Sequence, residues 1–409
     1  EGDVAQIGDT TYATLDAAIE EAESGNTIIV LADASSDGIG LNGKNLTIQG
    51  ASGVTPTITF ANEGIHAVNS NLTFKDCVVE MTVSENPGHS GGTANLIDDS
   101  DLTFVNTDVT ITNDHKDTTG ESAIYLYQGS NLYIQDDSHM TVSGFNDTSS
   151  DSGIFADGSE REDNLPHFQI EISNNSTLSI SKCGWGGMTV NPCDVTVSDQ
   201  SKLAITDCGA NGGKQGFGCY YGKLSVKDHS TVDVSGNKGD DWGMFVKDLE
   251  VDGTSTLLAN NNTGSGIAVG GEGNIESGAT VTINQNAETG LWVYKSEPTW
   301  SGNVTIKDGA NVNIQKNMDN GIYNTGILTM ESGTIMYNYA NGYGGGVDNR
   351  NILTLTDDVK IYHNHAKVGG DDIYTTSAAT LTFAKVGSDW VLDDCEPDHL
   401  IDGWYDDST

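Results

Sequence analysis

Residues 290–324 read GLWVYKSEPTWSGNVTIKDGANVNIQKNMDNGIYN and span one complete repeat of the chain. The segment opens on a glycine–apolar–x–apolar run that starts at Gly290, and the same kind of run starts again at Gly321. Between these starts lie two short alternating runs, Val304-Thr-Ile306 and Val312-Asn-Ile314. Alternation of this kind is typical of a β-strand with one buried face. The repeat therefore predicts three short strands separated by turns.

The glycine-led run recurs along much of the chain at spacings of 23 to 34 residues. It begins at Gly153, Gly187, Gly216, Gly243, Gly266, Gly290, Gly321 and Gly346, and a related run begins at Ala123. A fixed period of this length indicates a solenoid or a propeller, but a WD40 blade has four strands and a longer period. We therefore predict an all-β fold, a parallel β-helix with three strands per coil, in which equivalent strands pair at ~4.8 Å.

A second pattern places a small polar residue or cysteine three residues after the last inward apolar residue of a coil. Its members are Cys77, Cys183, Cys208, Asn237, Asn262, Asn286, Asn317, Asn338 and Asn364. In a stacked solenoid such amides can hydrogen-bond from coil to coil. The alternative is that asparagine is simply common in turns. We expect buried thiols rather than a disulfide framework, since bridging Cys183 and Cys208 would be geometrically demanding.

The ends of a β-helix expose unpaired backbone groups and need caps. At the N-terminus, Thr14 is a suitable helix N-cap. An apolar stripe follows it and predicts a capping helix over 15–23. The stripe comprises Leu15, Ala18, Ile19 and Ala22. We divide the chain into an N-terminal cap (1–32), a β-helix (33–385) and a C-terminal aromatic tail (386–409) that includes Trp390, Trp404 and Tyr405.

The opening stretch IGDTTYATLDAAIEEAESGNTIIVL, residues 7–31, resembles the start of pectate-lyase-like β-helix domains. The resemblance is strongest to such domains in wall-anchored surface adhesins of Gram-positive gut bacteria. The later runs Gly321-Ile-Tyr-Asn324 and Ile361-Tyr-His-Asn364 also look like that group. The resemblance implies a right-handed β-helix and adhesion at a cell surface, and it carries over no catalytic residue. Since no sortase signal of the LPxTG type is present, wall anchoring would lie outside these residues.

The charge of the chain argues against several classes of partner. The formal net charge is −41, from 59 acidic and 18 basic residues. Such a field repels nucleic acid and anionic membranes, and it disfavours polyanionic substrates. No apolar run approaches the ~20 residues of a membrane span. Neutral sugars and cationic partners remain compatible, although an acidic surface can also serve solubility alone.

Motifs of β-helix enzymes were sought and not found. A lyase would need a basic proton acceptor among clustered acids, but Arg161 lies in an acidic loop and Arg350 just past a strand. A glycosidase would need paired carboxylates. Candidates are Asp240, Asp241, Asp348, Asp371 and Asp372, which are more simply explained as turn residues. The pair His363 and His365 lacks a third metal ligand. We therefore predict no catalytic residue, metal site or cofactor, and nothing supports a calcium site.

The aromatic residues indicate a binding surface instead. The x residue of each glycine-led run should point outward, and aromatic rings at these positions would be exposed on one face. Flat rings with polar neighbours suit neutral sugars. The predicted ligand-binding residues are Trp292, Tyr323, Phe245, Tyr294, Tyr220, Lys247 and Asp348. The small residues Thr189, Gly218 and Ala268 would leave dents beside them, and insertions near 84–94, 113–122, 145–152 and 158–166 could wall the strip. The competing interpretation is that the rings pack beneath loops.

These patterns favour a secreted, extracellular surface module that binds a glycan or a host or microbial surface protein without catalysis. We expect a monomer, without nucleic acid or membrane insertion. The alternative is a glycoside hydrolase, or less favoured a polysaccharide lyase, acting on a neutral or mucin-type glycan. A third hypothesis is a passive stalk. The first two differ in whether two carboxylates converge within ~5–9.5 Å beside the aromatic rings.

Overall fold

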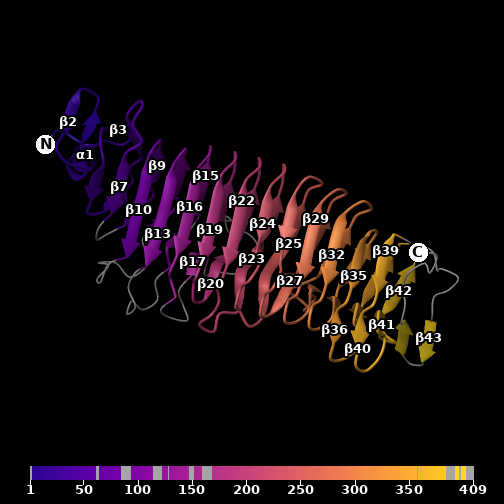
Figure 1. The fold of residues 1–409 in the computed structure, drawn as a ribbon. Helices are drawn as coiled ribbons and strands as arrows, with labels where there is room; N and C mark the ends of the chain where they lie inside the picture. The colour runs from indigo at the N-terminus through magenta and orange to yellow at the C-terminus, as the bar shows by residue number, and fades with distance from the viewer. Residues whose placement is uncertain are drawn as a thin grey trace. The chain divides into compact units, whose positions relative to one another are not determined.

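The computed structural model describes residues 2–60, 64–83, 94–113, 122–127, 129–146, 152–158, 168–356, 358–383, 392–395 and 398–401. The chain divides into two compact units, residues 1–213 and residues 214–409. Within each unit, short strands from consecutive coils stack side by side (Figure 1). Each unit is described by itself.

In unit 1, equivalent strands of successive coils form three parallel ladders. The first ladder contains β5 (Ile39–Asn42), β8 (Ile65–Val68), β11 (Ala94–Ile97), β14 (Ile124–Tyr127), β17 (Ser152–Asp157) and β20 (Gly186–Asn191). The second contains β3 (Asn26–Val30), β6 (Leu46–Gly50), β9 (Asn71–Lys75), β12 (Asp101–Val105), β15 (Asn131–Gln135), β18 (Phe168–Ile172) and β21 (Cys193–Val197). The third contains β4 (Ala34–Ser36), β7 (Thr57–Phe60), β10 (Val78–Val83), β13 (Asp108–Asn113), β16 (His139–Ser143), β19 (Thr177–Ser181) and β22 (Lys202–Thr206).

Unit 1 begins with a small antiparallel segment and a helix. β1 (Ala5–Ile7) pairs antiparallel with β2 (Thr10–Tyr12) and with β3. Helix α1 (Leu15–Glu21) follows, and the Thr14 hydroxyl accepts a hydrogen bond from the Ala17 backbone N–H at 3.2 Å. Leu15, Ala18 and Ile19 are buried. The helix thus forms at the predicted place, two residues shorter than expected, and its role as a cap stays a prediction.

Unit 2 also has three parallel ladders, formed in the same way by equivalent strands of successive coils. The first contains the N-terminal parts of β23 (Gln215–Val226) and β25 (Trp242–Val251), then β27 (Ser265–Val269), β30 (Leu291–Val293), β33 (Ile322–Asn324), β37 (Val347–Asn349) and β41 (Ile373–Thr375). The second ladder contains the C-terminal parts of β23 and β25, followed by β28 (Glu272–Ile275), β31 (Asn303–Ile306), β34 (Ile327–Met330), β38 (Ile352–Leu355) and β42 (Thr380–Phe383). The third contains β24 (Thr231–Asp233), β26 (Thr256–Leu258), β29 (Thr280–Asn284), β32 (Asn311–Gln315), β35 (Gly333–Met336) and β39 (Val359–Tyr362).

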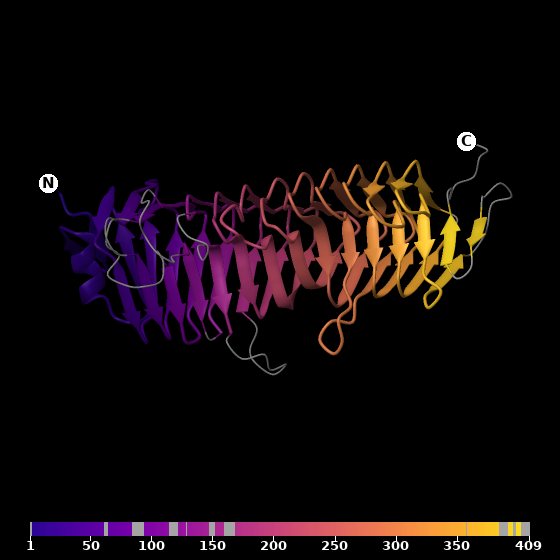
Figure 2. The ribbon, with the colours of Figure 1, turned by 90° about the horizontal axis from the view of Figure 1, so that it is seen from below.

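Two further elements complete unit 2. β36 (Tyr339–Ala340) and β40 (His365–Ala366) form a short parallel pair after the third ladder. β43 (Leu392–Cys395) and β44 (Asp398–Ile401) form an antiparallel hairpin, and β44 pairs antiparallel with β41 (Figure 2). The hairpin is formed by residues of the predicted C-terminal tail. Trp390, Trp404 and Tyr405 of that tail lie outside the described residues.

The asparagine ladder of unit 2 is confirmed. The ladder comprises Asn237, Asn262, Asn286, Asn317, Asn338 and Asn364, all buried. The Oδ1 of Asn317 accepts from the backbone N–H of Asn286 at 3.0 Å and from its Nδ2 at 2.9 Å. The same two bonds recur from Asn317 to Asn338 and from Asn338 to Asn364. Asn364 donates to the buried Oδ1 of Asp372, at 2.9 Å from its Nδ2, so the ladder ends on a carboxylate.

Unit 1 uses hydroxyl groups in a comparable way, which the sequence analysis missed. Backbone N–H groups of Thr107, Ser138 and Ser176 each donate at 3.1 Å to the hydroxyl of the equivalent residue one coil later. Cys77 lies in this serine and threonine row, with its sulfur 3.9 Å from the Thr107 hydroxyl. Its predicted place in the asparagine register was therefore wrong, because Cys77 precedes the third strand of its coil whereas Cys183 follows it.

The fold prediction is confirmed: the described residues are all-β apart from α1, with parallel ladders and three strands per coil. The five cysteines with described side chains, Cys77, Cys183, Cys193, Cys208 and Cys219, are buried and unbridged. Arg161 and most residues of the insertions near 84–94, 113–122, 145–152 and 158–166 lie outside the described part of the chain. Within the described residues, no helix is long and apolar enough to cross a membrane.

Candidate functional site

The outward x residues of unit 2 form one continuous row across the first ladder, as predicted. Strand register places them next to each other in the order Gly218, Phe245, Ala268, Trp292, Tyr323, Asp348 and Tyr374. Equivalent strands lie ~4.8 Å apart, so adjacent members of the row can touch. The Trp292 and Tyr323 rings do so, with centroids 5.1 Å apart and ring planes at 76°.

Phe245 is not the exposed ring that its outward position suggested. Only 2% of it is accessible, although it points to the outer face. Four rings surround it at centroid distances of 5.0 to 5.8 Å. They belong to Tyr220, Trp242, Tyr294 and Trp300. Phe245 therefore forms the buried centre of an aromatic group that lies on the sheet, and it can support a ligand-binding surface only from below.

Trp300 is one of three rings that sequence reasoning missed, together with Tyr221 and Trp242. It ends a tight turn in which Ser296 and Trp300 exchange backbone hydrogen bonds of 2.9 and 3.0 Å. Its ring lies 5.1 Å from both Phe245 and Tyr221. A Cβ at Gly270 would lie 2.6 Å from this ring, so the turn packs closely on the sheet. The available signal was the 31-residue spacing from Gly290 to Gly321, which is longer than the spacings just before and after it.

We call the group formed by Tyr220, Tyr221, Trp242, Phe245, Trp292, Tyr294, Trp300 and Tyr323 the outer aromatic cluster. All its rings except Phe245 are partly exposed. The Trp292 ring meets Trp242, Tyr294 and Tyr323 at angles of 64° to 76°, so the cluster presents ring edges and faces in turn. The Trp292 indole Nε1 is buried and has no hydrogen-bond partner among the described residues.

The predicted polar residues lie beside the cluster but differ in what they can offer a ligand. Lys247 follows Phe245 on β25 and is half-buried. Asp348 is buried and accepts two hydrogen bonds from Arg350, at 2.6 Å from Nε and 2.8 Å from Nη2. Burial raises the pKa of the Asp348 carboxyl, and the Arg350 guanidinium opposes that change. The Tyr220 hydroxyl donates to the Gln215 Oε1 at 3.0 Å, and burial raises its pKa to about 12.

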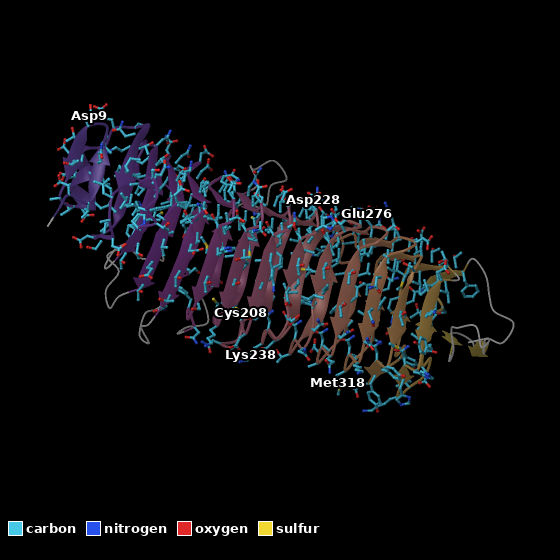
Figure 3. The ribbon with its side chains drawn as sticks, turned by 45° about the horizontal axis from the view of Figure 1, so that its top comes forward. Asp9, Cys208, Asp228, Lys238, Glu276 and Met318 are labelled. Atoms are coloured by element: carbon cyan, nitrogen blue, oxygen red, sulfur yellow. The ribbon has the colours of Figure 1, made fainter. Side chains whose placement is uncertain are left out.

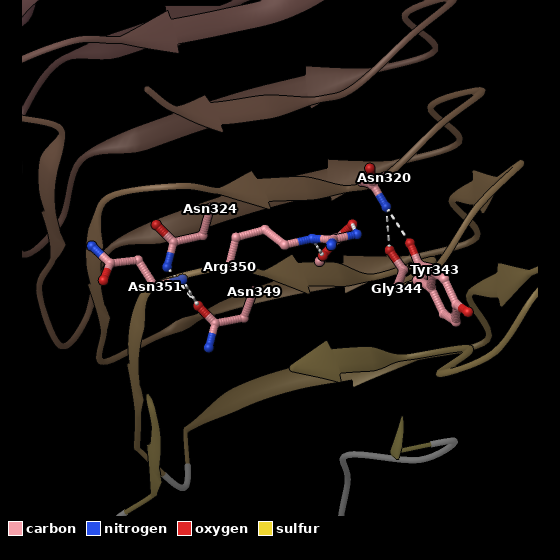
Figure 4. A network of polar contacts seen from close by, with 8 residues as sticks. Asn320, Asn324, Tyr343, Gly344, Asn349, Arg350 and Asn351 are labelled. Atoms are coloured by element: carbon pink, nitrogen blue, oxygen red, sulfur yellow. Dashed lines mark hydrogen bonds and ion pairs between the residues drawn. The ribbon is translucent and has the colours of Figure 1, made fainter. Parts of the chain in front are cut away.

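Arg350 joins the cluster to a second pair of rings. Its guanidinium carbon lies 5.0 Å from the centroid of the Tyr374 ring, which stacks on Tyr343 at 4.2 Å. Asn320 holds the segment of Tyr343 by donating to the carbonyl oxygens of Tyr343 and Gly344, at 2.7 and 2.6 Å (Figure 4). The same view shows Asn324 pointing to Asn349, to which it donates at 2.9 Å. Polar groups and rings are thus held together at one end of the row.

A set of carboxyl groups flanks the row, only partly as predicted. Burial raises the pKa of Glu288 and of Asp319, and repulsion from the charge of Asp319 adds to the rise at Glu288. Asp241 raises the pKa of Glu288 further, and Asp319 raises that of Asp348. Glu288 and Asp319 were not singled out in the sequence, because they lie in turns among many other acids. Within the described residues, no three metal-binding side chains form a group that could hold an ion.

Comparison with known proteins adds a weak structural similarity. No protein family model matches the chain, and no curated protein matches it. Crystal structures of the periplasmic alginate epimerase AlgG, unmutated and with single substitutions, superpose on it with TM-scores of 0.40 and 0.41. The identity is 12%, over 88% of this chain and 84–85% of the epimerase chain. A similarity at this level carries no inference about activity.

Proposed function

We propose that the chain is a carbohydrate-binding module and that the outer aromatic cluster of unit 2 is its binding surface. The observation that carries this proposal is a set of partly exposed rings around Phe245, with the Trp292 indole N–H unpaired. A buried donor without a partner is costly to the free protein, and a ligand that displaces the side chains covering it can supply the acceptor. A sugar offers hydroxyl acceptors together with apolar C–H faces that pack on aromatic rings.

The charge of the surroundings favours an uncharged sugar at this cluster. Glu288, Asp319 and Asp348 lie along its flank, and the one guanidinium there is already paired with Asp348. The carboxylates of Glu288 and Asp319 would repel a carboxylated or sulfated sugar, and the half-buried Lys247 beside the cluster opposes this repulsion only in part. The ligand class is therefore a neutral glycan. In line with the resemblance of the N-terminal sequence, we place the module outside the cell, on a bacterial surface, in an adhesive role.

A glycan array followed by titration calorimetry on each hit tests this proposal. Trp292→Ala should weaken binding by more than about 1 kcal/mol, as at a binding hot spot. The melting temperature should change little, because Trp292 is partly exposed. Tyr133→Ala, which removes a partly exposed ring from β15 in unit 1, is the matched control and should bind normally. If Trp292→Ala lowers stability while the folded fraction binds as before, the cluster is a packing element and the proposal fails.

Glycoside hydrolysis is the second candidate, and one observation favours it. Asp319 acts electrostatically on both Glu288 and Asp348, so three carboxyls with raised pKa values lie near one another beside the cluster. A carboxyl whose pKa is raised is better suited to act as a general acid. Incubation of each binding glycan with the protein and product analysis decides between the two functions. Reducing ends that are absent with Asp319→Asn would establish hydrolysis, and intact glycan would establish binding alone.

A further inference from the structure

We infer that unit 2 carries a second, separate ligand site, on the edge beside the asparagine ladder, and that it binds an anionic sugar. The site does not depend on the outer aromatic cluster. It consists of two rows of side chains from three consecutive coils, one on each side of the buried ladder. One row is Lys316, Tyr337 and His363, and the other is Met318, Tyr339 and His365. We call the two rows the basic aromatic edge.

Exposed apolar groups concentrate on this edge. Among the described residues, seven large hydrophobic side chains are exposed, and four of them belong to or adjoin the edge. They are Met318 (59%), Val368 (57%), Tyr337 (51%) and Tyr339 (39%). A group of exposed apolar side chains is costly to solubility and usually marks an interaction site. Met318 lies on the opposite side of unit 2 from Asp228 and Glu276, in the same rim as Lys238 (Figure 3).

The rings of the edge contact one another in pairs and lie beside the buried ladder. Tyr337 stacks on His363 with centroids 5.5 Å apart and planes at 18°, and Tyr339 lies 5.0 Å from His365. Tyr339 and His365 also pair directly in the strands β36 and β40. Each row flanks ladder asparagines that bond from coil to coil at 2.9 to 3.0 Å. The ring faces are therefore held in place before any ligand arrives, which lowers the entropy cost of binding.

On the basic aromatic edge, larger side chains occupy the left-handed turn position that precedes each ladder asparagine. In unit 2 the residue before each ladder asparagine has a left-handed backbone, and earlier coils place Gly236, Asn261 and Gln285 there. The last three coils place Lys316, Tyr337 and His363 at φ angles of 59°, 56° and 55°. Glycine and asparagine tolerate this conformation, whereas large residues adopt it at a cost in free energy.

The charge of the edge determines the ligand class. Lys316 and Lys367 are exposed, and the Lys367 Nζ lies 5.8 Å from the centre of the Tyr339 ring. One acid near the edge, Asp371, is occupied: it accepts from the Ala366 backbone N–H at 2.8 Å and lies 3.2 Å from the His365 Nδ1. In a chain of net charge −41, this edge offers the ammonium groups of Lys316 and Lys367 to a negative charge.

The size of the edge points to a sugar rather than to a protein. Three coils at ~4.8 Å span about 10 Å along the ladder. A specific protein interface needs about 800 Å² per partner, which far exceeds such a patch. One or two pyranose rings fit its length, with C–H faces on Tyr337 and Tyr339 and a carboxylate or sulfate near Lys316 and Lys367. These observations assign the edge to a carboxylated or sulfated saccharide.

Calorimetric titration with sialyllactose, a heparin-derived disaccharide and lactose tests the inference on the full chain. Sialyllactose and the heparin disaccharide separate carboxylate from sulfate, and lactose is the neutral control. At least one anionic sugar should bind about tenfold more tightly than lactose. Lactose binding as tightly as both anionic sugars, or no binding of either anionic sugar at millimolar concentration, overturns the inference.

Two variants locate the binding, and each introduces a residue that an earlier coil carries at the same position. Tyr337→Asn and Lys316→Gln should each weaken the anionic sugar several-fold without lowering the melting temperature, because Asn261 and Gln285 already satisfy that backbone. Trp292→Ala should leave this binding unchanged, which separates the edge from the outer aromatic cluster. Binding that survives both edge variants, or that is lost only with Trp292→Ala, overturns the assignment.

Discussion

Replacement of Asn317 by leucine removes one link of the asparagine ladder and keeps the branched shape and the number of heavy atoms of the side chain. The Asn317 side chain accepts from the backbone N–H and the Nδ2 of Asn286, and it donates to the Asn338 Oδ1 at 2.9 Å and the Ile283 carbonyl at 3.0 Å. Leucine offers no acceptor, so two buried donors of Asn286 lose a partner. The Asn338 Oδ1 keeps the backbone N–H of residue 317 at 3.0 Å. At about 1–3 kcal/mol per unsatisfied group, the loss is about 2–6 kcal/mol.

Urea unfolding monitored by circular dichroism measures this loss, with Asn311→Leu as the matched control. Asn311 lies on the same strand, β32, but its side chain is exposed. The control should therefore change the unfolding free energy by no more than about 0.5 kcal/mol. Native-state hydrogen exchange should also show faster exchange at the Asn286 amide in Asn317→Leu. If both variants unfold at the same urea concentration, the ladder does not stabilise the coil and the reasoning is wrong.

Three further predictions concern other parts of the chain. Burial raises the pKa of Asp319 in the folded state, so ionisation of this carboxyl lowers the stability of the protein as the pH rises. Asp319→Asn should therefore raise the unfolding free energy at pH 7, and this gain should vanish at acidic pH. A gain that does not depend on pH would contradict the prediction. Ile19→Asp places a charge among the buried residues of α1 and should cost several kcal/mol, so an unchanged melting temperature would argue against a cap. Burial raises the pKa of Cys77 to about 11, so iodoacetamide at pH 8 should leave Cys77 unmodified in the native protein and label it in urea, as mass spectrometry would show.

The period of the sequence was sufficient to predict the ladders and their register. Alternation fixes which side chains point inward, and the glycine-led runs recur once per coil, so the sequence alone places Trp292 and Tyr323 side by side, as the structure shows. The asparagine ladder followed from the same counting. Cys77 was misplaced because the rule counted from the last inward residue of a strand without identifying which strand of the coil it was.

The burial and the pairing of the predicted site residues depend on contacts that the sequence repeat does not encode. Phe245 is outward but buried, because Trp300 returns to it from a turn 55 residues later in the chain. Asp348 is paired with Arg350 on the same strand end, which periodicity does not reveal. The exposed rings Tyr337 and Tyr339 were passed over because the search followed glycine-led strands and not the residues beside the ladder.

The indole resonance of Trp292 gives the most direct test that the outer aromatic cluster binds carbohydrate. Two-dimensional ¹H–¹⁵N spectra resolve the indole N–H signals of the six tryptophans, and Trp292→Phe assigns the one in question. Titration with a neutral glycan from the array should move the Trp292 signal downfield in proportion to occupancy, because its Nε1 gains an acceptor. Saturable binding that leaves the Trp242, Trp292 and Trp300 signals in place would contradict the account.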